Sequence, residues 1–183
     1  AIRLRPNHSD AHNNLGILQT TREQPEAALA SFTEALRLKP DSADARHNLG
    51  AVLADLGRHE EAVTHIRAAI AHDNRQPEYH NSLGTSLQIM GRPIEALACY
   101  EEALRLNPQH VWAHFNRSAV WLLQGRFDEG WPEFEWRWKR PGLAARDFGR
   151  PEWDGSPLPN GTVLLFAEQG LGDTLQFIRF VRQ

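Results

Sequence analysis

The sequence predicts an all-α fold, a solenoid built as a stack of antiparallel helix pairs, over most of its 183 residues. Two observations predict this fold: a set of residues returns every 34 positions, and apolar residues follow helical spacing inside each unit. A third observation separates the stack from the end of the chain, because all six tryptophans lie after residue 110. The chain therefore has two parts of different composition.

Composition and charge limit the classes of function. The hydrophobic share of 41% and the charged share of 23% are those of a folded protein. A net charge of −3 offers no basic face for nucleic acid. The sequence shows no signal peptide and no apolar run of the roughly 20 residues that a membrane span needs. We therefore expect a cytoplasmic protein that binds neither nucleic acid nor membranes, with its single Cys99 reduced and packed inside a helix pair.

The repeat is clearest in a motif of five residues. HNNLG at 12–16 returns as RHNLG at 46–50, as HNSLG at 80–84 and, degraded, as HFNRS at 114–118. Further positions keep the same step: Ala28, Ala62 and Ala96; Phe32, Ile66, Tyr100 and Phe134; Ala35, Ala69 and Ala103; Pro6, Pro40 and Pro108. Because many positions agree at one spacing, the sequence predicts four consecutive units of one design.

Each unit reads as a helical hairpin. The first helix carries adjacent Leu and Gly, and the glycine allows the partner helix to approach closely. A turn follows, marked by Gly57-Arg58, Gly91-Arg92 and Gly125-Arg126. The second helix places a small, a large and a small residue at i, i+4 and i+7, and proline ends it. One hairpin cannot bury this apolar stripe alone, so neighbouring hairpins must stack.

The order Leu-Gly, Ala, aromatic, Ala and Pro resembles the tetratricopeptide repeat (TPR) family over residues 1–141. The resemblance implies a right-handed superhelix of antiparallel helix pairs. The expected division is a tail of a preceding repeat at 1–8, repeats at 9–42, 43–76 and 77–110, and a degenerate repeat with junction helices at 111–141.

One position of the first helices is a candidate binding site. Asn14, Asn48 and Asn116 are in register, and Ser82 fills the remaining place. The first helices of such stacks line the concave face, where extended peptides are held, and an amide can pair with a peptide backbone without reading its sequence. The row resembles the asparagine ladder of O-linked N-acetylglucosamine transferases, which implies peptide binding, and Ser82 departs from that pattern. The alternative is that these side chains cap or bridge adjacent repeats.

Two other kinds of site are disfavoured. A clamp for a C-terminal carboxylate needs basic first helices, but the chain has only two lysines, both near the ends of second helices. The in-register His12, His80 and His114 lie on successive hairpins, roughly 10 Å apart. Zinc ligands must converge within about 2 Å of one ion, so we expect structural histidines and no metal.

The repeat degrades after Gly125. Gly130 replaces the first alanine of the stripe, and Pro132 is tolerable only in the first turn of a helix. The aromatic residues of this segment cannot all face one stripe: Trp131, Phe134, Trp136 and Trp138. We expect a wide, Trp-rich helix at 127–140 that is covered on more than one side, as at a junction with another domain. The alternative is a terminal cap.

The end of the chain has a different pattern. A Pro- and Gly-rich linker at 142–161 precedes an apolar run of strand length at 162–168, and 162–183 reads as one strand and one helix. The turn between them offers helix-start amides for an anion, through Gln169, Gly170, Gly172, Asp173 and Thr174. It is neither a P-loop nor the dinucleotide fingerprint. Asp173 is either a helix N-cap or a general base.

The segment 125–183 resembles bacterial proteins in which TPRs precede a glycosyltransferase domain of the two-Rossmann (GT-B) type, similar to heptosyltransferases. The resemblance implies a truncated Rossmann-like unit, Asp173 as the base, and a nucleotide-sugar donor bound by the parent protein, with no cofactor and no activity in this fragment. We carry three hypotheses: the acceptor-recognition arm of a glycosyltransferase, a pure interaction scaffold, and a carbohydrate-assembly enzyme whose repeats recruit partners. The strand at 162–168 is expected to pack on the Trp-rich helix 127–140 or to pair with a second copy of the chain. A homodimer through either of these two segments is therefore a candidate assembly.

Overall fold

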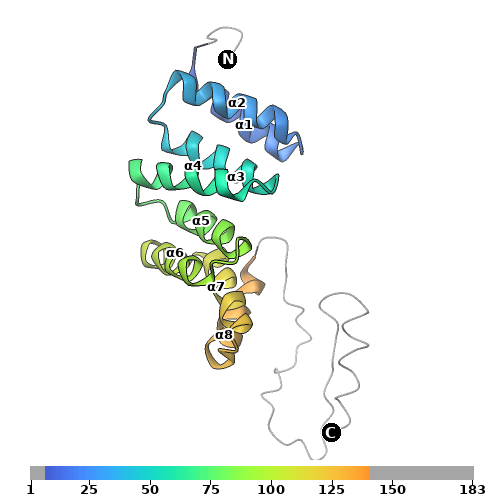
Figure 1. The fold of residues 1–183 in the computed structure, drawn as a ribbon, viewed down its shortest axis with the longest axis vertical. Coiled ribbons are helices and arrows are strands. Elements are labelled where there is room, and N and C mark those ends of the chain that lie inside the picture. The colour runs from blue at the N-terminus through green and yellow to red at the C-terminus, as the bar shows by residue number, and fades with distance from the viewer. Residues whose placement is uncertain (1–6, 141–183) are drawn as a thin grey trace, which may run out of the picture. The chain divides into compact units, whose positions relative to one another are not determined.

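The computed structural model describes residues 7–140, and every element in that range is helical. Four antiparallel pairs of α-helices follow one another and end in a short 3-10 helix (Figure 1). Their bounds are α1 Ser9–Thr21, α2 Pro25–Leu38, α3 Ala43–Asp55, α4 His59–His72, α5 Pro77–Ile89, α6 Pro93–Leu106, α7 Val111–Leu123, α8 Phe127–Phe134 and η1 Glu135–Lys139. The predicted all-α stack of helix pairs is confirmed for these residues. The expected linker at 142–161 and the strand–helix unit at 162–183 lie outside them.

The stacking places the first helices side by side. Each of α2, α4 and α6 packs against its own first helix and against the first helix of the next pair, and α8 packs against α7 and η1. The first helices also contact one another directly, α1 with α3, α3 with α5, and α5 with α7. Residues 34 positions apart on these helices therefore form one continuous line. We call the line of Asn14, Asn48, Ser82 and Asn116 the first-helix row.

The recurring spacing between a glycine of the first helix and a large residue of the second helix has a steric cause. A Cβ atom at Gly16 would lie 2.5 Å from the ring of Phe32, and one at Gly84 would lie 2.5 Å from the ring of Tyr100. The corresponding distance at Gly50, to the Ile66 side chain, is 2.7 Å. These large side chains are fully buried, as are the alanines of the stripe: Ala28, Ala35, Ala62, Ala69, Ala96 and Ala103. The glycines thus allow the two helices of a pair to close on one large residue, as the sequence predicts.

The turns within the pairs also follow the repeat. Gly57, Gly91 and Gly125 adopt φ values of 75°, 72° and 76°, in the left-handed region that favours glycine. Glu23 stands at the same register of the first pair and adopts φ 56°. A hydrogen bond closes each turn, for example from the Arg58 amide to the Leu53 carbonyl at 2.8 Å.

The last pair differs from the prediction. The expected wide helix over 127–140 is wrong, because α8 ends at Phe134 and η1 continues the chain. Pro132 lies in the second turn of α8, outside the first turn in which a helix tolerates proline. A proline there cannot donate to the Asp128 carbonyl, which weakens α-helical continuation. Among residues 7–140, no helix is long and apolar enough to cross a membrane.

Candidate functional site: the first-helix row

The four residues of the predicted row lie on four successive first helices. Asn14 is on α1, Asn48 on α3, Ser82 on α5 and Asn116 on α7. Asn14 is exposed, and the other three are half-buried. All four therefore remain accessible to a molecule that lies across the first helices.

Two asparagines of the row, Asn48 and Asn116, bridge adjacent repeats. Asn48 donates from Nδ2 to Oδ1 of Asn13 at 3.0 Å, and Asn116 donates from Nδ2 to Oδ1 of Asn81 at 3.0 Å. Asn116 Nδ2 also donates to Oγ1 of Thr85 at 3.3 Å. These partners were not predicted from the sequence, although the 35-residue spacing of two Asn–Asn pairs was a signal for them.

The middle link of the row uses a different pair of residues, His47 and Ser82, which we call the central rung. His47 Nε2 lies 3.0 Å from Ser82 Oγ. At the same registers the flanking links have two asparagines, so a longer side chain on α3 reaches a shorter one on α5. Ser82 and His47 therefore each replace an asparagine of the flanking links, and the two residues contact each other.

Tyr79 supports the central rung. Its ring stacks on the His47 ring, with centroids 4.6 Å apart, and its hydroxyl donates to the Asp44 carboxylate. The same register holds alanine on the other first helices: Ala11, Ala45 and Ala113. Burial, followed by the Asp44 hydrogen bond, raises the pKa of Tyr79. The hydroxyl therefore stays protonated as a donor.

Charges around the central rung act in opposite directions. Burial lowers the pKa of His47, against the opposing effects of Glu78, a hydrogen bond to Asn48, and Asp44. The pKa of Glu78 is also lowered, chiefly by its hydrogen bond to His110, whose Nε2 lies 2.8 Å from Oε2. The neutral ring and the carboxylate are therefore the favoured forms at neutral pH.

Histidines hold the turns between repeats. His80 Nε2 lies 3.1 Å from the Asn74 carbonyl, and His114 Nε2 lies 2.9 Å from the Pro108 carbonyl. Arg46, at the same register, donates to the Pro40 carbonyl at 2.7 Å. These side chains fix the backbone just before each first helix. Within residues 7–140, no three metal-ligating side chains lie close enough together to hold an ion.

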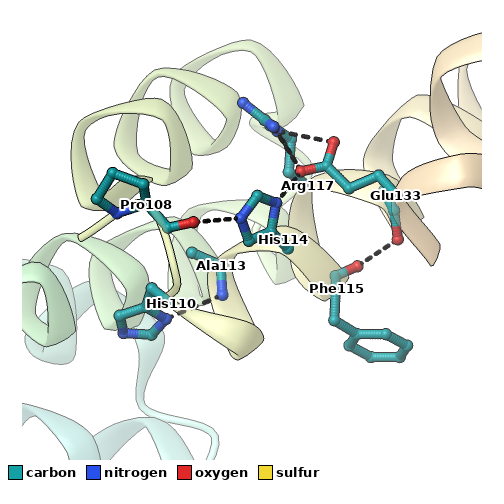
Figure 2. Close-up of polar contacts among 8 residues, drawn as sticks. Pro108, His110, Ala113, His114, Phe115, Arg117 and Glu133 are labelled. Atoms are coloured by element: carbon teal, nitrogen blue, oxygen red, sulfur yellow. Dashed lines mark hydrogen bonds and ion pairs between the residues drawn. The ribbon is translucent and has the colours of Figure 1, made fainter. Parts of the chain in front are cut away.

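A buried carboxylate fastens the last pair of helices (Figure 2). Glu133 of α8 is 8% exposed and accepts from Arg117 of α7, with Nη2 to Oε1 at 2.5 Å and Nε to Oε2 at 3.1 Å. His114 Nδ1 lies 2.5 Å from the same Oε1. The His114 ring also stacks on Trp136, with centroids 3.7 Å apart. The role of Glu133 was not predicted, because a lone glutamate in a degenerate repeat forms no sequence pattern.

The aromatic residues of the last pair divide between packing and exposure. Trp136 packs on His114 and carries the Lys139 ammonium 3.5 Å from its ring centroid. Phe127 and Trp131 are each 56% exposed. The expectations of a domain junction and of a homodimer here stay predictions. The candidate anion loop, which contains Asp173, lies outside the described residues.

Comparisons with known proteins agree with this fold. Models of the tetratricopeptide repeat match residues 19–84, 77–110 and 111–130. A search of curated protein sequences gave no match. The structure of MamA is similar, with 22% sequence identity and a TM-score of 0.67, and the match covers 75% of this chain and 81% of MamA. YrrB, described as a TPR protein with an unusual peptide-binding site, has 24% identity and a TM-score of 0.64, with 76% of this chain and 72% of YrrB covered. A Thermobaculum terrenum O-GlcNAc transferase mutant has 25% identity and a TM-score of 0.60, with 62% of this chain and 22% of that protein covered. The four helix pairs, the 34-residue register and these matches together place the chain in the tetratricopeptide repeat family.

Proposed function

We propose that the first-helix row binds an extended segment of a partner protein through Asn14, Asn48, Ser82 and Asn116. The observation that carries the proposal is the orientation of the row amides. Each bridging asparagine is held by a hydrogen bond to the preceding first helix, so its remaining polar group is fixed before a ligand arrives. Side chains that are already ordered lose less entropy on binding.

Asn116 shows what such a residue offers. Both hydrogens of its Nδ2 are engaged, by Asn81 and by Thr85. Its Oδ1 has no recorded partner within residues 7–140, and the side chain is half-buried. A fixed carbonyl of this kind accepts a hydrogen bond from a backbone N–H, which every residue except proline provides.

The spacing of the row suits an extended chain. Packed helices lie roughly 8–10 Å apart, and an extended backbone advances about 3.3 Å per residue. Successive row residues would therefore meet about every third residue of a bound segment. Contacts to the backbone alone make this recognition tolerant of sequence.

The experiment measures retention of a mixed pool of capped peptides without titratable side chains on the immobilised chain. Replacing Asn48 and Asn116 together by alanine should weaken retention about thirtyfold, because each of the two lost hydrogen bonds contributes roughly 1 kcal/mol. The comparison variant replaces Asn13 and Asn81 by alanine, which breaks the same links between repeats but keeps the row amides. It should lose only the benefit of their fixed orientation and therefore weaken retention less than the row variant does. Equal retention by the row variant and the wild type would overturn the proposal.

We further propose that the chain is the acceptor-recognition arm of a larger bacterial glycosyltransferase. The similarity of 25% to an O-GlcNAc transferase supports this, although the chain covers 22% of that protein. Gln169, Gly170, Gly172 and Thr174 would then hold donor phosphate, with Asp173 as the base. Turnover of nucleotide sugars by the whole protein, lost in Asp173→Asn, would support this role. Peptide retention without any turnover would leave an interaction scaffold.

A further inference from the structure

Departures from the repeat concentrate at one contact between first helices. His47 replaces the asparagine found at Asn13 and Asn81, and Ser82 replaces the asparagine of the row. Tyr79 replaces an alanine that the other three first helices share. His47 contacts both of the others, since its Nε2 lies 3.0 Å from Ser82 Oγ and its ring stacks on Tyr79. The α3–α5 contact is therefore specialised, while the two flanking links keep the Asn–Asn pair.

The specialised link contains a group that titrates, unlike its neighbours. An Asn–Asn pair keeps its donors and acceptors at any ordinary pH, whereas histidine changes charge between about pH 5 and 8. The titratable groups that face the ring are Asp44 on its own helix and Glu78 and Tyr79 on α5, with His110 of α7 bonded to Glu78. From α1, Asn13 forms the neighbouring link with Asn48 and carries no charge.

Protonation changes the hydrogen bonding of the central rung. In the neutral ring, Nε2 can either donate to Ser82 or accept from it, according to the tautomer. In the imidazolium, Nε2 can only donate, so Ser82 Oγ must accept and its hydroxyl hydrogen must turn away from the ring. A positive charge also arises in a half-buried ring stacked on a buried tyrosine.

We propose that the central rung of His47 and Ser82 makes binding along the first-helix row sensitive to pH, with tight binding in the neutral state and release on acidification. The inference rests on the proposed function. An uncharged segment lying across the row covers the rung and removes further water from the ring, which disfavours the imidazolium. Binding then requires loss of the proton from His47. Because binding and deprotonation are linked, the affinity for the segment falls as His47 of the free chain becomes protonated.

The experiment repeats retention of the capped, uncharged peptide pool between about pH 7.5 and about pH 5, the range in which histidine changes charge. Retention by the wild type should fall about threefold to tenfold, within the limit of about tenfold per pH unit for one linked proton. The double variant His47→Asn, Ser82→Asn installs the Asn–Asn link that the chain already contains twice. This variant should retain the pool equally at both ends of the range.

The control variant His72→Asn removes an exposed histidine at the end of α4 and should keep the pH dependence of the wild type. Circular dichroism at both pH values checks that every variant is folded. Retention that is independent of pH in the wild type, or equally dependent on pH in the Asn–Asn variant, overturns the inference and leaves the proposed function standing. Failure to retain the pool at any pH overturns both.

Discussion

Asn116 on α7 donates a hydrogen bond of 3.0 Å to Asn81 on α5, and Asn48 on α3 makes the same bond to Asn13 on α1. The residues expected to contact a peptide therefore also join neighbouring repeats. The two interpretations of the row are compatible, because the bond uses Nδ2 and keeps the amide in one orientation. A side chain that links two helices is better ordered for a ligand than one that is free to rotate.

The close approach at Gly84 predicts a large effect of one methyl group. Gly84→Ala should lower the free energy of unfolding by about 1–3 kcal/mol, because the new Cβ would lie 2.5 Å from the Tyr100 ring. Urea denaturation measures the change. In a Tyr100→Leu background the same alanine should cost clearly less, since the ring carbon is gone. An equal cost in both backgrounds would show that helix propensity, and not contact with Tyr100, sets the requirement for glycine.

The buried carboxylate of Glu133 should control the last pair of helices. Glu133→Gln leaves Arg117 without its charged partner and should cost about 3 kcal/mol or more. Because repeat stacks open locally, hydrogen exchange of the α8 amides is the suitable measurement. The control Glu129→Gln breaks an exposed pair with Arg126 and should leave the protection of α8 almost unchanged, because solvent screens that pair. Similar protection of α8 in both variants would contradict the assigned role of Glu133.

His110 should act both as a helix cap and as a partner of Glu78. Its Nδ1 accepts from the Ala113 amide at 3.1 Å, as Ser42 caps α3 at the same register. His110→Ser should therefore keep the cap, while His110→Ala should cost about 1 kcal/mol more. Thermal unfolding of the two variants measures this difference, and equal melting temperatures would rule out the cap.

The same pair predicts a dependence on acid. The His110 hydrogen bond lowers the pKa of Glu78 below its ordinary value of 4.5. A depressed carboxyl pKa contributes stability above pH 4.5, and this contribution is lost as the pH falls through the lowered pKa. His110→Ser should flatten this part of the stability profile, which denaturation at a series of pH values records. An unchanged loss of stability at acid pH in this variant would show that another carboxylate causes that loss.

Cys99 should react slowly as long as the chain is folded. Burial raises the pKa of its thiol from 9.0 to about 11, so the reactive thiolate is about a hundredfold rarer than in an unfolded chain. Labelling with a disulfide reagent, with and without urea, compares the two states. Equal rates would show that the α6 thiol is open to solvent.

Much of this fold follows from the 34-residue step. The pairing of Gly84 with Tyr100 could be inferred because a missing side chain and a large one recur at constant spacing. The early end of α8 could not, since it depends on how Pro132, a proline in the second turn, competes with tertiary packing. The repeat pattern predicts the bounds of a helix when many positions agree with it, and in the last repeat too few positions agree.

The site was predicted in part. The register placed Asn48 and Asn116 on one line, and the structure adds which atoms are already engaged. The pairing of His47 with Ser82 was not found, because each departs from the repeat in a different way and only their contact explains both. Three-dimensional proximity turns two apparent irregularities into one link.

We propose that a bound segment contacts the amides of the first-helix row. The most direct measurement follows the side-chain amide signals of the labelled chain by NMR as the capped peptide pool is added. The Nδ2 signals of Asn48 and Asn116 should shift together, while that of Asn74, in the turn before α5, should stay in place. Shifts confined to second-helix residues, with both row amides unmoved, would contradict it.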